Sequence, residues 1–243
     1  MAGSLQRLGG VIGVNVDTHR DAHNEKGYFE NLNALYANEE LLRLAGSCWD
    51  AEDALPMGMA DDPRYDMSIM RMGDFFARDM ELAEGSFLIV KDPRIGLLLP
   101  LYLKVFRGLG VEPSFLFCDR RDDEIVESLR IRDDFDRSHT VAMTATHRQS
   151  VQRFEDEIDV VWVSTFDCLF KKMTPFFRWL AVRFDLPLTL TAETLAAVDN
   201  FLETGLQHHK AVDWNGLWGT EIIRDPVSIT IPDWALLGSQ DAD

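Results

Sequence analysis

The sequence predicts a single α/β domain in three layers, with a central parallel β-sheet between two layers of helices. Three short apolar runs, at residues 87–90, 114–118 and 160–163, lack polar–apolar alternation. Such runs are typical of strands that are buried on both faces of a sheet. A helical pattern follows each run, and strands that alternate with helices pair in parallel through right-handed crossovers. The length of 243 residues fits one domain of this class.

Helices are predicted where apolar side chains recur at helical spacing. These segments are 1–8, 32–44, 67–82, 95–109, 122–132 and 169–184, with one or two further helices at 135–155. Gly110 and Pro187 follow two of the segments and are typical helix stops.

The remaining segments have weaker signals. Residues 11–16 alternate with a period of two, which allows a fourth strand. Proline and glycine indicate a loop at 50–66. We expect one domain over residues 1–243, in which 211–243 form a loosely structured C-terminal tail.

Composition limits the classes of function. The formal net charge is −17, which argues against nucleic-acid binding because that binding needs basic patches. No apolar stretch is long enough to span a bilayer, and the start has no signal-peptide pattern. The three cysteines form no CxxC or Cys/His pattern, so neither a disulfide framework nor a metal site is expected. We therefore expect an acidic, cytoplasmic protein; nothing in the sequence indicates an oligomeric state.

Charged residues follow the predicted strands at the point where each strand ends. The first run is followed by Lys-Asp-Pro-Arg at 91–94 and the second by Asp-Arg-Arg-Asp at 119–122. In open parallel sheets, ligands bind outside the carboxyl ends of the strands. Since cations are scarce in this chain, the two tetrads predict an anion-binding edge.

Arg120 and Ser128 are the clearest candidates for binding a phosphate. Arg120 ends a strand, and a guanidinium can hold phosphate with two parallel hydrogen bonds. Ser128 lies about two turns into the next helix and can donate a hydroxyl. Arg121 can add a second contact, and Asp122 can cap the helix. The alternative is a surface arginine at a strand end and a solvated helix serine.

Four stretches together resemble the bacterial sulfotransferase family, which has the P-loop NTPase-like fold. Residues 24–30 are similar to the family's N-x-K-G-Y-F-E, and 87–94 to a strand that ends in K-D-P-R. Residues 115–132 are similar to the segment R-N-P-x-x-V-x-x-S-L, and 201–210 to F-x-x-x-L-x-H-H. The resemblance implies transfer of a sulfuryl group from 3′-phosphoadenosine 5′-phosphosulfate (PAPS) to a hydroxyl or amine acceptor, a small molecule or a glycan.

The resemblance also implies roles for individual residues. Arg120 and Ser128 would hold the 3′-phosphate of PAPS or of its product adenosine 3′,5′-bisphosphate (PAP), with Arg121 as an additional contact. Glu30 would be the base that accepts the proton of the acceptor. Lys91 or Arg94 would neutralise charge on the transferring group, without a metal.

Each catalytic candidate also has a structural alternative. Glu30 can be a carboxylate that the dipole of the following helix favours. The K-D-P-R residues can form a turn with internal ion pairs.

The sequence departs from the family at two places. Arg121 and Asp122 stand where Asn and Pro are usual. The family's first strand and its loop G-x-x-R-S-G-T, which holds the 5′-phosphosulfate through backbone N–H groups, have no counterpart, and residues 1–10 resemble the helix that follows this loop. We expect weak nucleotide binding and slow or absent transfer. If the start is misassigned, we expect about 15–25 in-frame codons upstream of Met1 to encode such a strand and loop.

Two other classes of function were considered. A catalytically inactive sulfotransferase-like nucleotide-binding or assembly protein is the main alternative, because the phosphate loop is absent. A nucleoside triphosphate kinase or hydrolase is disfavoured, since the sequence has no GxxxxGK[ST] pattern. The acceptor pocket is expected between the segments 50–66 and 133–147.

Overall fold

The computed structural model describes residues 1–17, 19–21, 24–164 and 173–202. In this part of the chain the protein is mostly helical, with a two-stranded parallel sheet of β1 (Ser114–Asp119) and β2 (Asp159–Ser164). The helices are α1 (Ala2–Arg7), α2 (Leu32–Leu44), α3 (Asp66–Leu82), α4 (Ile95–Gly108), α5 (Asp122–Asp133), α6 (Arg137–Gln152), α7 (Met173–Arg183) and α8 (Ala192–Phe201), with 3-10 helices at Met57–Asp61 and Pro63–Tyr65. Among the described residues, no helix has the length and apolar character needed to cross a membrane.

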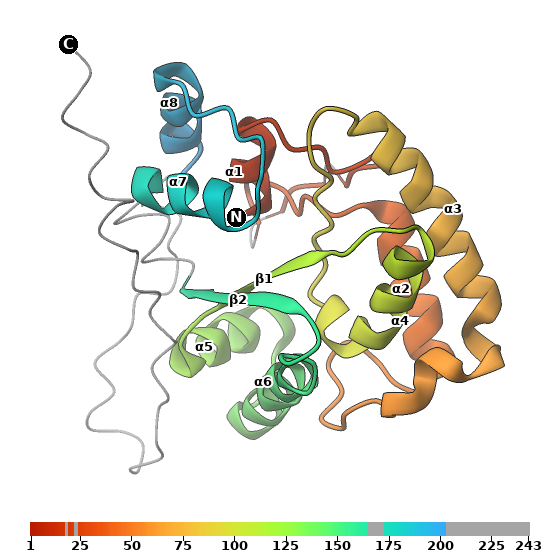
Figure 1. Ribbon diagram of the computed structural model, residues 1–243. Helices are drawn as coiled ribbons and strands as arrows, with labels where there is room; N and C mark the ends of the chain where they lie inside the picture. Colours follow the sequence, from red (N-terminus) through yellow and green to blue (C-terminus); the bar gives the residue numbers. More distant parts are fainter. Residues whose placement is uncertain (18, 22–23, 165–172, 203–243) are drawn as a thin grey trace, which may run out of the picture.

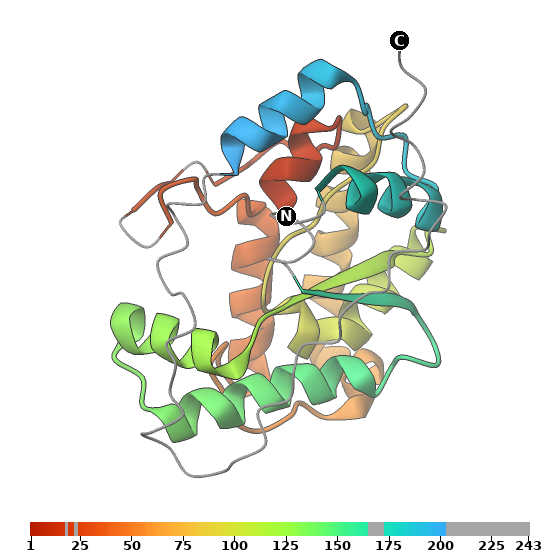
Figure 2. The same cartoon turned by 90° about the vertical axis from the view of Figure 1, so that its left-hand side faces the viewer.

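Helices lie on both sides of the strand pair (Figure 1). Helices α5 and α6 are on one side, and α1, α7 and α8 are on the other. Figure 2 shows α8 lying across α1, where the Arg7 guanidinium stacks 3.7 Å from the centroid of the Phe201 ring. The predicted arrangement of helices around a parallel sheet is therefore confirmed in outline.

The two strands pair in parallel, in a register that runs from Ser114 opposite Asp159 to Asp119 opposite Ser164. This confirms the predicted pairing of 114–118 with 160–163. Complete burial of both strands was wrong, because side chains of β1 are exposed or half-buried. In the described part of the chain each strand has one hydrogen-bonded neighbour.

The two faces of the sheet pack against different clusters. On one face Leu116 and Val161 pack with the fully buried Val163 against Phe176 and Phe177 of α7. On the other face the rings of Phe117 and Trp162, which are register partners, lie 4.2 Å apart. Cross-strand ring pairs of this kind stabilise a sheet beyond the area they bury.

The third apolar run, 87–90, is not a strand of this sheet. Leu88 instead forms a parallel bridge with Val11, through hydrogen bonds from Val11 N to Phe87 O and from Ile89 N to Val11 O. The close approach depends on Gly10, since a Cβ at that position would lie 2.4 Å from Ile89 Cδ1. The predicted set of three adjacent strands is thus confirmed for two of them, and 87–90 pairs with the weakly predicted segment 11–16.

Most predicted helices are present. α2 has the predicted bounds, α3, α4 and α5 agree within one residue, and 135–155 contains one helix, α6. The predicted loop at 50–66 includes the two 3-10 helices. Part of the predicted helix 169–184, and the predicted tail 211–243, lie outside the described residues.

One helix was missed. α8 begins at a reciprocal capping box, in which Thr191 Oγ1 accepts from Thr194 N and Thr194 Oγ1 accepts from Thr191 N. Thr194 stands at the position where Glu or Gln is the more familiar sign of a capping box. The helix start was therefore readable from the sequence only as a variant of the usual pattern.

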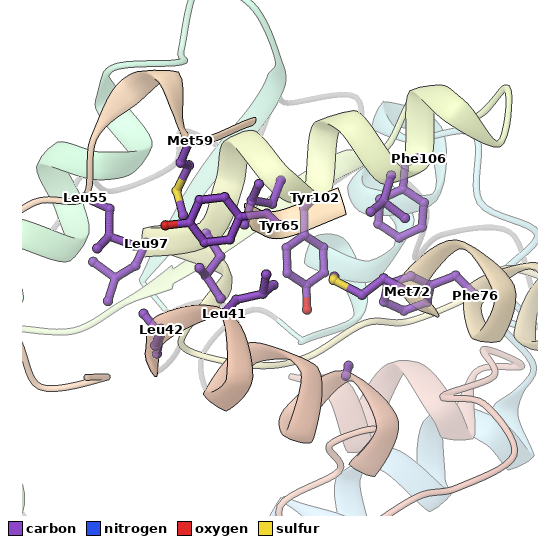
Figure 3. Close-up of a cluster of buried hydrophobic side chains, with 14 residues drawn as sticks. Leu41, Leu42, Leu55, Met59, Tyr65, Met72, Phe76, Leu97, Tyr102 and Phe106 are labelled. Carbon is purple, nitrogen blue, oxygen red and sulfur yellow. The ribbon is translucent and has the colours of Figure 1, made fainter. Parts of the chain in front are cut away.

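A second core cluster joins α2, α3 and α4 (Figure 3). Phe76 of α3 packs on Tyr102 and Phe106 of α4, with ring centroids 6.0 and 4.9 Å apart. The Tyr102 hydroxyl donates to Asn38 Oδ1 on α2 at 2.9 Å. Burying a side chain of this size contributes about 1.5–3 kcal/mol to the stability of the fold. The cluster therefore stabilises the packing of α2, α3 and α4.

A buried polar network fixes the loop that precedes α2. Asp79 of α3, 2% exposed, accepts hydrogen bonds from Val14 N at 2.9 Å and Asn31 Nδ2 at 2.6 Å. Asn31 also caps α2, because its side-chain oxygen accepts from Asn33 N and Ala34 N. Gly13 lies directly against this network with a φ of +120°.

We expect Gly13→Ala to lower the free energy of unfolding by about 2–4 kcal/mol, because backbone strain and displacement of buried polar groups add together. A Cβ at Gly13 would lie 2.5 Å from Asn31 Nδ2 and 2.6 Å from Asp79 Oδ2. The control is Gly73→Ala in α3, where a Cβ meets nothing and should raise stability by about 0.5–1 kcal/mol. Denaturant unfolding measures both variants. Equal stabilities of the two variants would contradict this account of the network.

Candidate functional site

Two of the predicted site residues, Glu30 and Lys91, form an ion pair. Lys91 Nζ lies 2.5 Å from Glu30 Oε1, and the two residues are 61 positions apart in the chain. The Glu30 side chain is 7% exposed and that of Lys91 is 38% exposed. Glu30 directly precedes the cap of α2, and Lys91 directly follows the segment that pairs with Val11. The fold therefore joins the two motifs at one place.

The backbone next to Glu30 is in an unusual conformation. Phe29 has a φ of +55°, which is rare for a large side chain. Its ring packs edge-on against Phe201, with centroids 5.6 Å apart, and close to Gly3 of α1. Such conformations persist only where the surroundings enforce them, and they cluster at functional sites. This strain supports a functional role for Glu30.

Tyr28 lies beside the ion pair and was missed by the sequence reasoning, although it belongs to the motif Gly-Tyr-Phe-Glu. Lys91 Nζ is 5.9 Å from the centroid of its ring. The Tyr28 hydroxyl donates to Asp21 Oδ2 at 2.6 Å, and this hydrogen bond, helped by burial, raises the pKa of Tyr28 to about 12. The Tyr28 hydroxyl is therefore protonated at neutral pH, and the Tyr28 ring lies next to the Lys91 ammonium group.

Arg94 is held by carboxylates of the chain. Its Nε lies 2.5 Å from Glu39 Oε1 and its Nη1 lies 3.0 Å from Asp92 Oδ1. Burial opposes the charge of Arg94, but Asp92 and Glu39 outweigh it and raise the pKa of Arg94. The Asp92 side chain is 1% exposed, and its Oδ2 has no hydrogen-bond partner. For Arg94 this geometry matches the alternative of a turn with internal ion pairs.

Arg120 and Arg121, which directly precede α5, also face carboxylates of that helix. Arg120 Nε lies 3.5 Å from Glu124 Oε2, one turn further along α5. Arg121 binds Asp123 with two bonds, of 3.1 and 3.0 Å. The bidentate pair of Arg121 with Asp123 is the stronger of these two arrangements.

A third arginine, Arg148 of α6, binds the turn between β1 and α5, which comprises residues 119–122. Its Nη2 donates to Asp119 Oδ1 and to the Arg120 carbonyl oxygen, both at 2.9 Å, and its Nη1 donates to Asp122 Oδ1 at 2.5 Å. These carboxylates outweigh the cost of burial and raise the pKa of Arg148. Sequence reasoning missed Arg148, because no local pattern indicates which turn a helix residue reaches.

The expected cap of α5 was wrong. Arg121 is the cap residue, it makes no side-chain capping bond, and Asp122 is the first residue of the helix. The Asp122 carboxylate is taken by Arg148 instead. A carboxylate in the first turn interacts favourably with the helix dipole. Asp122 therefore stabilises α5 and also binds Arg148.

Ser128 lies half-buried near the end of the second turn of α5. The joint binding of one phosphate by Arg120 and Ser128 stays a prediction.

His147 of α6 binds the loop that contains Trp49. Its Nε2 lies 2.9 Å from the Trp49 carbonyl oxygen. Burial lowers the pKa of His147, and the backbone of Trp49 and Pro93 and the charge of Asp92 only partly oppose this shift. Adjacent residues of α6, His147 and Arg148, thus contact two separate segments of the chain.

Among the described residues, no group of three or more His, Cys, Asp or Glu side chains could hold a metal ion. The histidine pair His208 and His209 of the family-like stretch 201–210 lies outside those residues.

Comparison with known proteins gave no match. No protein-family model matches the chain, and no curated protein or solved structure is significantly similar to it. The functional assignment therefore depends on the motifs and on the geometry described above.

We expect the stability of the protein to fall as the pH decreases from 7.5 to 5, and His147→Gln to weaken that dependence. The lowered pKa means that the unfolded chain binds a proton near pH 6.5, where the folded protein resists it. Stability decreases where the unfolded state binds more protons. The carboxylates with lowered pKa, Asp62 and Asp136, have ordinary values of 3.8 and titrate below this window.

Thermal unfolding of both proteins at the two pH values measures this effect. The difference in melting temperature between wild type and variant at pH 7.5 gives the stability lost with the contact between His147 and the Trp49 carbonyl. An identical pH dependence in wild type and variant would show that His147 is not the responsible group.

Proposed function

We propose that this chain has a sulfotransferase-like function. It would bind PAPS and transfer the sulfuryl group to a hydroxyl or amine of a small-molecule or glycan acceptor, leaving PAP. The observation that carries the proposal is the ion pair between Glu30 and Lys91. Each residue belongs to a different family-like motif, and a shared reaction site requires that the two motifs meet.

The pair suits the proton transfer that the reaction needs. The acceptor oxygen attacks the sulfur while the bond from sulfur to the bridging phosphate oxygen breaks. Glu30 takes the acceptor proton, which neutralises its carboxylate. The positive charge of Lys91 is then no longer balanced by Glu30, and it stabilises the charge that develops on the bridging oxygen. The Tyr28 ring lies on one side of the ion pair, and its hydroxyl keeps its proton.

The other end of the nucleotide is assigned to Arg120, Arg121 and Ser128. A phosphate would compete with Glu124, whose Oε2 lies 3.5 Å from Arg120 Nε. Phosphate carries more charge than a carboxylate and can accept two parallel hydrogen bonds from guanidinium. Arg121, which binds Asp123 with two bonds, is the secondary contact.

A second candidate function is a catalytically inactive sulfotransferase-like nucleotide-binding or assembly protein. The observation that favours it is the engagement of Arg94 and Arg121 by carboxylates of the chain. Calorimetry with PAP, followed by a transfer assay with labelled donor and an acceptor mixture, separates the two functions. Transfer supports the enzyme, binding without transfer supports the second candidate, and absence of binding contradicts the proposed nucleotide site.

We expect Glu30→Gln to reduce the transfer rate by about 10²-fold or more, which is typical for loss of a general base. The affinity for PAP should change less than about twofold, since Glu30 acts at the acceptor and not at the 3′-phosphate. The matched control is Glu25→Gln, an exposed residue of the same loop, which should keep the wild-type rate. Equal rates for the two variants in the labelled-donor assay would remove Glu30 from the reaction.

We expect substitutions of Arg120 and Glu124 to change PAP affinity in opposite directions. Arg120→Ala should weaken binding by about 1.5–3 kcal/mol, the usual range for a hydrogen bond to a charged group. Glu124→Gln removes the competing carboxylate and should strengthen binding by up to about 1 kcal/mol. Calorimetric titration at fixed ionic strength measures both. Unchanged affinity of the Arg120 variant would mean that the phosphate binds elsewhere.

A further inference from the structure

The turn between β1 and α5 depends on contacts from outside its own sequence. The turn contains no proline to fix a backbone angle, and the cap residue Arg121 makes no side-chain capping bond. The candidate phosphate ligand Arg120 lies in this turn. A ligand residue must be held within about 0.5 Å of its productive position to bind well, so another element has to supply the rigidity.

Arg148 supplies it through one planar side chain. The guanidinium donates to both oxygens of Asp119, to Asp122 Oδ1 and to the Arg120 carbonyl oxygen. It therefore contacts the turn at its first, second and last residues. The Arg148 side chain is mostly buried, as are those of Asp119 and Asp122. Buried charge-assisted bonds of this kind are stronger and more directional than exposed ones.

Arg148 also changes the electrostatics of the turn. Asp119 and Asp122 are carboxylates next to the residue that would bind a phosphate, and alone they would repel it. One guanidinium in contact with both cancels part of their charge. The side chain thus has two separable effects on an anion at Arg120, one geometric and one electrostatic.

We propose that Arg148 is a positioning residue for the nucleotide site, which fixes the direction of Arg120 without touching the ligand. This inference rests on the proposed function.

The test compares PAP with adenosine 5′-monophosphate, which lacks the 3′-phosphate. The ratio of their dissociation constants isolates the contribution of that phosphate, and a general loss of stability would not change it. Arg148→Lys keeps the charge but cannot form the planar set of bonds. We expect it to reduce the ratio about tenfold. Arg153→Lys, an exposed residue just after α6, is the matched control and should leave the ratio within about twofold.

Asp122→Asn provides a second variant that keeps Arg148 and weakens one of its bonds. It should reduce the ratio less than Arg148→Lys does, and it decides the question if the Arg148 variant does not fold. Hydrogen exchange of residues 119–122 should be faster in both variants than in wild type.

The outcomes separate this inference from the function on which it rests. A wild-type chain that binds the two nucleotides equally well overturns the proposed phosphate site and the role of Arg148 with it. A wild-type preference for PAP that persists unchanged in the Arg148 and Asp122 variants overturns the positioning role alone. A reduced preference in these variants, with the Arg153 control intact, supports it.

Discussion

The hydrogen bond from Asn31 to Asp79 is the interaction on which the candidate site depends. The Asp79 carboxylate is buried on α3, and a buried charge without partners would be very unfavourable. It obtains partners only if Asn31 and the backbone of Val14 come to it. Because Asn31 is also the cap of α2, this requirement fixes both the start of that helix and the residue before it, Glu30. The Glu30 carboxylate is thus placed by a polar contact in the core.

A second constraint is the balance of charge at the edge of the sheet. The chain has a net charge of −17, yet its arginines gather where β1 ends. Each is matched by neighbouring acids: Arg148 with Asp119 and Asp122, Arg121 with Asp123, and Arg120 with Glu124. The turn is therefore organised before any ligand arrives. Organisation before binding reduces the cost of ordering side chains, although an anion must compete with the carboxylates already present.

Local signals in the sequence were sufficient for most helices and for the type of sheet. The bounds of α2 follow from its apolar spacing and from Asn31, and the parallel pairing of β1 with β2 follows from the helices between them. The partner of 87–90 could not be read in this way, because the choice of Val11 depends on the close approach that Gly10 allows. Periodicity indicates that a strand exists but does not identify its neighbour.

In the candidate site, too, some features follow from local sequence patterns and others depend on distant contacts. Glu30 and Lys91 were predicted separately from their motifs, and the fold brings them together. Arg148 and His147 were not predicted, since their partners lie 26–29 and 98 residues away. Tyr28 lies within a recognised motif, but the sequence did not indicate that its ring lies beside the Lys91 ammonium group. Contacts between distant segments are the part that local sequence patterns do not encode.

Two consecutive residues of α6 contact separate segments of the chain, which has a mechanical consequence. His147 binds the Trp49 carbonyl, and Arg148 binds the turn between β1 and α5. Neighbouring residues are separated by about 1.5 Å along a helix axis. A small shift of α6 would therefore move the segment around Trp49 and the β1–α5 turn in the same direction, and the distance between these two segments would stay constant.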